Sequence, residues 1–142
     1  MSTTVSNLAV LLRSLEPALH PGVHAYCVVP HGADISALSP VATVSEPEGL
    51  TLVLPEEQAI GAGLPVLFRT AWITLTVHSD LQAVGLTAAF ASALGQANIS
   101  CNVVAGAFHD HIFVPVEQAQ RALTVLKALQ QESASRAAPL SP

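Results

Sequence analysis

The side chains best suited to chemistry are concentrated in one short segment, Phe108-His109-Asp110-His111. In an extended strand, His109 and His111 point to the same face with their Cα atoms about 6 to 7 Å apart, which permits joint ligation of a metal ion, while Asp110 points away. A zinc or iron site needs a third and a fourth ligand, and the sequence shows neither HExxH nor CxxC spacing. We therefore expect histidines on a half-buried sheet face and no metal; a metal-dependent enzyme at His109 and His111 is the weaker alternative.

A nucleophilic pair formed by Cys101 and a histidine is a second arrangement that could support catalysis. Cys101 lies in an apolar, strand-like segment, where burial disfavours the thiolate that such chemistry requires. The sequence contains no GxSxG motif, no phosphate-cradling glycine loop and no closely spaced pair of acids. We therefore expect no enzyme, no catalytic residue and no cofactor.

The turn at residues 79–86 is a different kind of candidate, because it joins a predicted strand to a predicted helix. Free backbone N–H groups in such a turn can hold a carboxylate, and the helix N-terminus adds a favourable potential for an anion. Asp80 could equally serve as a plain helix cap, and Gly85 allows a backbone or a ligand to approach closely. This turn and the hairpin near Gly106 could share one rim of a sheet.

The composition restricts the partners of the chain. Charged residues make up 11% of the 142 residues, against roughly 25% in ordinary domains, so we expect another subunit to cover part of the surface. Five Lys and Arg residues and a net charge of −5 leave no basic stripe for nucleic acid or an anionic membrane.

The uncharged stretch 81–108 is broken at Gly95 and Asn98, so it predicts a buried helix and a strand instead of a membrane span. With no signal-like N-terminus, the protein is predicted to be cytoplasmic.

A repeated phrase reveals the organisation of the chain. The segment 52–59 (LVLPEEQA) returns as 112–119 (IFVPVEQA), so Pro, Glu, Gln and Ala recur at the same spacing. Each copy predicts a strand that runs directly into a helix, with proline near the first helical position. Two copies indicate two similar α+β units, each with helices on one face of its sheet.

The elements are predicted from hydrophobic spacing and from Gly and Pro. They are a helix over 5–15, a strand over 24–30, a hairpin of 41–45 and 50–54, a short helix over 55–60, a strand over 71–77, a helix over 84–97, a hairpin of 99–105 and 109–114, and a helix over 117–129. The second unit has the order strand, helix, strand, strand, helix, and in the first unit a loop replaces the first helix. We place the N-terminal unit with its leading helix at 1–69, the C-terminal unit at 70–130 and a disordered tail at 131–142.

Two segments carry a resemblance to a known family. Residues 80–87 leading into a helix, and residues 106–115 across a hairpin, resemble an ACT domain of the small bacterial paired-ACT proteins; residues 48–55 resemble part of a degenerate first ACT unit. The chain is also similar to about half of the CASTOR-type arginine sensor of animals. The resemblance implies two ferredoxin-like ACT units of the βαββαβ type, the first degenerate, with antiparallel sheets.

The resemblance further implies a non-enzymatic regulatory protein that binds a small amino acid or a related metabolite at an ACT–ACT interface of a homodimer and signals to an unknown target protein. A protein-interaction or assembly module with a vestigial pocket is the alternative. Where the arginine sensor has an acidic residue in the turn, this chain has Ala83, and His109 stands in the place of an aromatic residue. Carried over by position, the ligand-binding residues are Asp80, Leu81, Val84, Gly85, Gly106, Ala107, His109 and Asp110 from one side and Ser100 and Cys101 from the other.

Overall fold

The computed structural model describes residues 4–76 and 85–137. In chain order the elements are α1 (Thr4–Arg13), β1 (Pro17–Leu19), β2 (His24–Val29), β3 (Ala42–Glu46), β4 (Gly49–Pro55), α2 (Glu56–Gly61), β5 (Phe68–Leu75), α3 (Leu86–Gln96), β6 (Asn102–Ala105), β7 (Asp110–Pro115), the 3-10 turn η1 (Val116–Gln118) and α4 (Ala119–Ala137). Each strand and helix that the sequence predicts is present, with ends that differ by a few residues.

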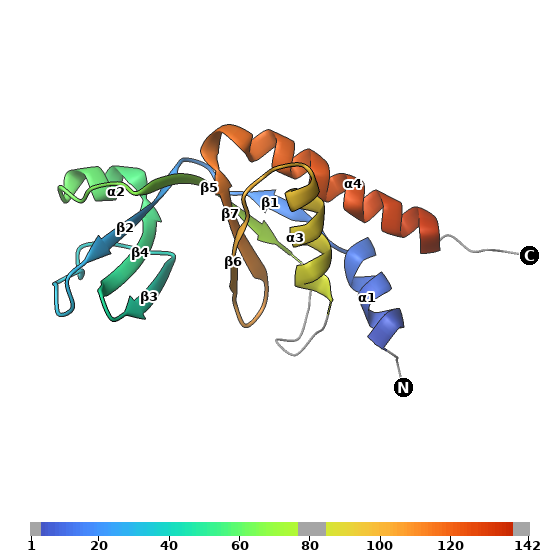
Figure 1. Ribbon diagram of the computed structural model, residues 1–142, viewed down its shortest axis with the longest axis horizontal. Helices are drawn as coiled ribbons and strands as arrows, with labels where there is room; N and C mark the ends of the chain where they lie inside the picture. The colour runs from blue at the N-terminus through green and yellow to red at the C-terminus, as the bar shows by residue number, and fades with distance from the viewer. Residues whose placement is uncertain (1–3, 77–84, 138–142) are drawn as a thin grey trace, which may run out of the picture.

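The strands form one sheet that is built from two related halves. The sheet has the order β3-β4-β2-β5-β7-β6, and β2 pairs with β5 at its centre. Reading outward from that central pair, β2, β4 and β3 on one side correspond to β5, β7 and β6 on the other. The two halves therefore share one order, with a helix (α3) where the first half has a loop, which confirms the predicted pair of α+β units (Figure 1).

The repeated phrase has the same structure in both places. Pro55 precedes α2 with φ −54° and ψ 133°, and Pro115 precedes η1 and α4 with φ −53° and ψ 136°. Because the proline ring fixes φ near −65° and lacks an N–H, it can end a strand and begin a helix without losing a ladder hydrogen bond. The two corners are thus the same local structure, specified by the same residues.

Strand β1 is not predicted by the sequence pattern. It adds to β5 beyond the end of β2, pairing Pro17 with Leu75 and Leu19 with Ile73. The backbone N–H of His20 donates to the carbonyl of Trp72 at 2.9 Å, which extends this pairing. Three residues beginning with proline carry too little periodicity to indicate a strand, and proline is tolerated because it occupies the first position of an edge strand.

The main hydrophobic core lies between the C-terminal half of the sheet and the helices α1, α3 and α4. Its fully buried members include Ile73, Phe90, Ile112 and Leu126, and Leu15 beyond α1 belongs to it as well. A smaller cluster packs β2 and β4 against α2. In packing, α1 and β1 belong with the C-terminal half, whereas the predicted boundary after residue 69 groups them with the N-terminal unit. The difference arises because Leu8, Leu11 and Leu12 of α1 pack against the larger core.

Helix α4 is longer than predicted. It runs to Ala137, so the predicted disordered tail is wrong for residues 131–137, and residues 138–142 lie outside the described ranges. Ala, Gln and Glu in this stretch favour helix, and the side chain of Gln130 donates to the carbonyl of Arg13 at 2.9 Å. The end of α1 thus anchors this part of α4.

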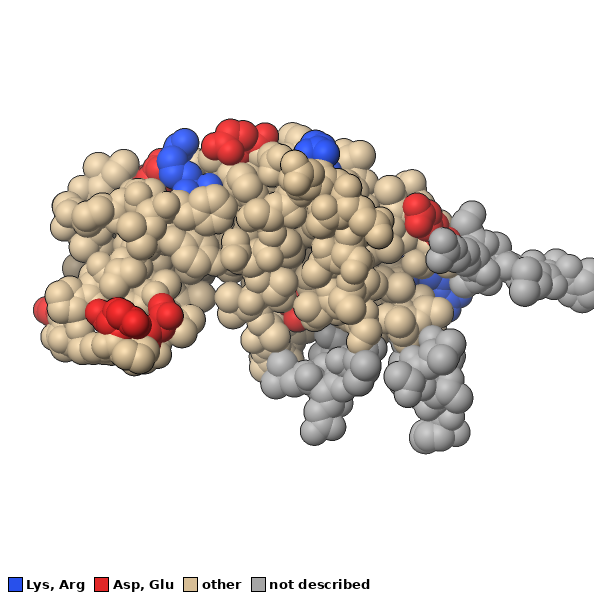
Figure 2. Space-filling view, viewed as in Figure 1, with Lys and Arg blue, Asp and Glu red and all other residues tan. Residues whose placement is uncertain are grey.

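The surface carries few charges. Figure 2 shows a face dominated by uncharged side chains, with Lys, Arg, Asp and Glu in small separate groups. Among the helices in the described ranges, none combines the length and the apolar character required to cross a bilayer.

Candidate functional site

Asp110 is the buried carboxylate at the start of β7. The hairpin before it is closed by the N–H of Gly106, which donates to the carbonyl of His109 at 2.9 Å. Asp110 lies opposite Leu75 and Ala105 in the sheet and is 7% exposed. Residues opposite each other share a sheet face, so Asp110 faces the helix-covered side with Leu75, and His111 faces the other side as predicted.

The electrostatic environment of Asp110 is unfavourable for its charge. Burial raises the pKa of this carboxyl above its ordinary 3.8, and the nearby His111 and His109 only partly oppose that shift. Asp110 forms no ion pair within the described ranges, where the acidic residue that pairs with an arginine is Glu56, with Arg69. A buried carboxylate without a Lys or Arg partner is the type of group that a ligand ammonium would stabilise.

Gly85 belongs to the predicted turn at residues 79–86. It is the residue before α3, in the left-handed conformation with φ 97°, and its carbonyl accepts the N–H of Ala89 at 2.9 Å. A Cβ at this position would lie 3.1 Å from Leu8 Cδ2, so α1 closes off one side of the turn. The predicted ligand residues Asp80, Leu81 and Val84 lie outside the described residues.

The other two predicted ligand residues lie at the far end of β6. Ser100 is exposed and Cys101 is half-buried, and both precede the strand, whereas Gly106 and exposed Ala107 follow it. Cys101 and Ala105 are four positions apart, which is about 13 Å at roughly 3.3 Å per residue. One small ligand therefore cannot touch both sets within a single chain. Burial raises the pKa of the Cys101 thiol to about 11, which keeps it protonated and agrees with the expectation of a disfavoured thiolate.

A cluster of polar and aromatic residues, which we name the Trp72 cluster, lies on the sheet face opposite the main core. It consists of Trp72, Thr74, His20, His24 and His111. The ring of His20 stacks on Trp72 with centroids 3.5 Å apart, and His24 meets Trp72 edge-on at 5.1 Å. Sequence alternation places Trp72 and Thr74 on one face, but His20 joins them only because β1 pairs with β5, a pairing that the sequence does not signal.

Hydrogen bonds connect the members of the Trp72 cluster. The indole N–H of Trp72 donates to Nδ1 of His111 at 3.1 Å, so this nitrogen carries no proton. The hydroxyl of Thr74 lies 3.0 Å from the same nitrogen and 2.6 Å from Nε2 of His20. The pKa values of His20, His24 and His111 are all lowered, mainly by burial, and neighbouring histidines add to the shift at His20 and His111. The cluster is therefore neutral at ordinary pH.

No group of three or more His, Cys, Asp or Glu side chains that could hold a metal is present in the described ranges. His111 is instead engaged with Trp72 through Nδ1. The described residues thus place a buried carboxylate, Asp110, directly after a tight hairpin at one end of the sheet.

The sheet order and the two matching strand-to-helix corners define a protein made of two ferredoxin-like units. Profiles of the ACT domain match residues 3–71 and residues 68–128. The chain belongs to the ACT-domain family, and it carries two copies of the domain.

Several solved structures are similar to this chain. A protein of unknown function from Vibrio cholerae, described as a possible transport protein, is 50% identical over 91% of this chain and 100% of its own, with a TM-score of 0.81. A protein from Agrobacterium tumefaciens is 15% identical over 82% of this chain and 89% of its own, with a TM-score of 0.64. The regulatory subunit of aspartate kinase from Thermus flavus is 12% identical over 80% of this chain and 95% of its own, with a TM-score of 0.60. The last two similarities concern the fold alone, and no curated protein matches the sequence significantly.

Proposed function

We propose that this chain is a cytoplasmic, non-enzymatic regulatory protein that binds a small amino acid or a related metabolite at an interface between the ACT domains of two copies. The observation that carries the proposal is Asp110, a buried carboxylate at the rim of the sheet whose charge has no Lys or Arg partner in the described ranges. The ligand ammonium would pair with Asp110, and the ligand carboxylate would meet backbone N–H groups of the turn before α3.

The separation of the candidate residues supports a homodimer. Ser100 and Cys101 lie at the opposite end of β6 from Gly106 and Asp110, so one copy supplies only half of the proposed site. A second copy would complete it by presenting its Ser100 end to the first copy's hairpin. This is the arrangement that the similarity to the CASTOR-type sensor suggests, with two copies in place of two halves of one chain.

The regulatory role is supported by structural similarity. The regulatory subunit of aspartate kinase shares the fold of this chain. Signalling further requires that the ligand bind two dimer arrangements with different affinities, because equal affinity shifts no equilibrium. A separate target protein would recognise one of the two dimer arrangements and so receive the signal.

The proposal is tested by screening the amino acids for thermal stabilisation of the purified chain. A ligand at about 100 times its dissociation constant stabilises a protein by about 2.7 kcal/mol. Asp110→Asn keeps the shape and removes the charge, and it should weaken binding by about 10- to 100-fold, since a charged hydrogen bond contributes about 1.5–3 kcal/mol. Asp34→Asn, in an exposed loop, is the matched control and should bind as the wild type does.

The oligomeric state of the same purified samples is measured by light scattering, with and without each amino acid. A dimer that is stabilised by one amino acid supports the proposal. A dimer that responds to none of them would favour the assembly module, because it would leave the pocket without a ligand. A monomer, or an Asp110→Asn variant that binds as tightly as Asp34→Asn, contradicts the proposal.

A further inference from the structure

A cavity of about 280 Å³ lies at the junction of the two halves, away from the Asp110 rim. Its walls are residues 21–23, which connect β1 to β2, His24 at the start of β2, and residues 55–57, where β4 turns into α2. The N–H of Glu56 donates to the carbonyl of Val23 at 2.9 Å and holds the two walls together. His24 pairs with Thr70, five residues along β5 from the partner of Asp110, so the two places are about 17 Å apart along the sheet.

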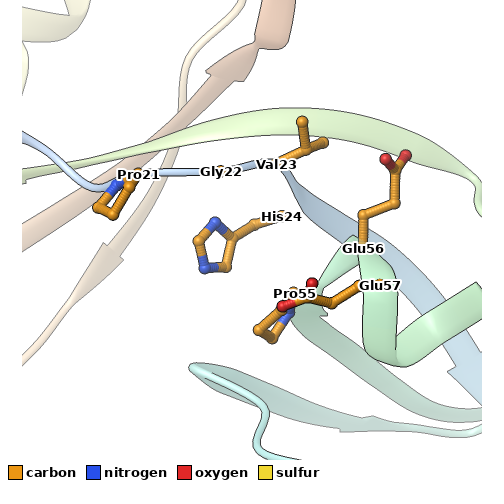
Figure 3. A pocket seen from close by; sticks show the side chains of 7 residues that line it. All are labelled: Pro21, Gly22, Val23, His24, Pro55, Glu56 and Glu57. Atoms are coloured by element: carbon orange, nitrogen blue, oxygen red, sulfur yellow. The ribbon is translucent and has the colours of Figure 1, made fainter. Parts of the chain in front are cut away.

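His24 is the buried polar side chain in this wall. It is only 6% exposed, and its Nδ1 is buried without a hydrogen-bond partner. Figure 3 shows its imidazole lying between residues 21–23 and Pro55. Burial lowers the pKa of His24, so the ring is neutral and has one nitrogen that can accept a hydrogen bond. An unmatched buried nitrogen is unfavourable, and a ligand that donates to the ring would relieve this cost.

The charge of the cavity comes from Glu57. Its side chain is directed toward the side of the cavity where His24 lies, whereas those of Val23 and Glu56 point away (Figure 3). Glu56 is already neutralised by Arg69, with Nε at 2.5 Å from one carboxylate oxygen and Nη2 at 3.1 Å from the other. Glu57 forms no ion pair in the described part of the chain, so its carboxylate is available to a cation.

The same walls are unsuited to an anion. No Lys or Arg lines the cavity, Pro21 and Pro55 have no N–H, and the N–H of Glu56 is occupied by Val23. A carboxylate would therefore find no cation and few donors here, so the walls favour a simple amine over a free amino acid. The proline rings, by contrast, offer apolar surface to a short hydrocarbon chain.

We propose that this cavity binds a small aliphatic amine in its protonated form. The ammonium donates to the carboxylate of Glu57 and to a ring nitrogen of His24, and the carbon chain lies against Pro21 and Pro55. This site is independent of the amino-acid site at Asp110, and either one can exist without the other.

The test uses the full chain at about pH 8, where an alkylamine is protonated and His24 is neutral. n-Butylamine is titrated while backbone amide NMR signals are followed, with butyrate and butanol as anionic and neutral ligands of the same length. We expect saturable shifts at Gly22, Val23 and Glu57 with butylamine alone. Equal shifts from butanol or butyrate, or no saturable shift at all, would overturn the proposal.

Two variants identify the groups that bind the amine. Glu57→Gln should weaken butylamine binding by about three- to tenfold, because the charge of a largely exposed carboxylate is lost. Glu48→Gln, in the β3–β4 turn, is the matched control and should leave binding unchanged. His24→Leu should lose affinity by about tenfold while its circular dichroism stays that of the wild type, because the orphan nitrogen is replaced by an apolar group. Equal binding by Glu57→Gln and Glu48→Gln, or undiminished binding by His24→Leu, contradicts the assignment.

Discussion

The Trp72 cluster can be tested by removing a single oxygen atom. Thr74→Val keeps the branched shape of the side chain and deletes the hydroxyl that lies 2.6 Å from His20 and 3.0 Å from His111. Thr74 is 6% exposed, so water cannot easily take the place of the hydroxyl. Each hydrogen bond contributes about 0.5–1.5 kcal/mol, and Trp72 still donates to His111 in the variant. We therefore expect a loss of about 1–2 kcal/mol in the free energy of unfolding.

The chain offers its own reporter for this measurement, because Trp72 is the single tryptophan of the sequence. Urea unfolding is followed by Trp72 fluorescence and by circular dichroism, and the expected loss corresponds to a fall in Tm of about 2–8 °C at this chain length. Thr124→Val removes an exposed hydroxyl that donates within α4 and should change the unfolding free energy by less than about 0.5 kcal/mol.

A double-mutant cycle separates the hydrogen bonds from other effects of the substitution. Combining Thr74→Val with His20→Ala should reveal a coupling energy of about 0.5–1.5 kcal/mol, because each change removes the same contact. A Thr74→Val protein as stable as the Thr124→Val control, or a coupling of zero, would refute the network described on this face.

Further expectations concern pH, the core and one turn. The histidines of the Trp72 cluster have pKa values lowered from 6.5, so unfolding takes up protons and stability, measured by urea unfolding, falls as the pH drops below about 6.5. At lower pH the fall flattens, because the pKa of Asp110 is raised from 3.8 and its protonation favours the folded state. A rise in stability just below pH 6.5 would contradict the sign for the histidines, and an Asp110→Asn variant with the same pH profile as the wild type would contradict the sign for Asp110. Leu126→Ala should cost about 2–5 kcal/mol in the same assay, since the side chain is fully buried. Gly49→Ala should lower Tm, because its Cβ would lie 2.8 Å from a backbone oxygen at φ 154°, whereas Gly61→Ala has open space and should not.

The sequence was sufficient for most of the secondary structure, because the relevant signals are local. Alternation in residues 71–77 predicts β5, the spacing of leucines predicts α1, and the two prolines of the repeated phrase predict both strand-to-helix corners. The short sequence of β1 lacks such a signal. It becomes a strand because the edge of β5 beyond β2 is open to pairing, and that opening exists only in the assembled sheet.

Some features of the candidate site also follow from the sequence, and others depend on the tertiary structure. The hairpin with Asp110 at its rim follows from the order of residues 106–110, and the structure places the carboxylate there. Its burial, and the absence of a Lys or Arg partner within the described ranges, depend on which elements pack around it. His20 and Trp72 are 52 positions apart in the sequence, so their stacking could not be inferred from spacing.

What the sequence by itself determined is therefore the repeated unit and the type of each long element, since these depend on hydrophobic period and on turn residues. The family came instead from the resemblance of residues 80–87 and 106–115 to an ACT domain, which the profile matches bear out. Tertiary structure alone decided which chemical groups share an environment: the histidines around Trp72, the orphan nitrogen of His24 beside Glu57, and the core that includes α1. The physical reason is that burial and the pairing of polar groups depend on contacts between distant segments, and such contacts leave no periodic pattern along the chain.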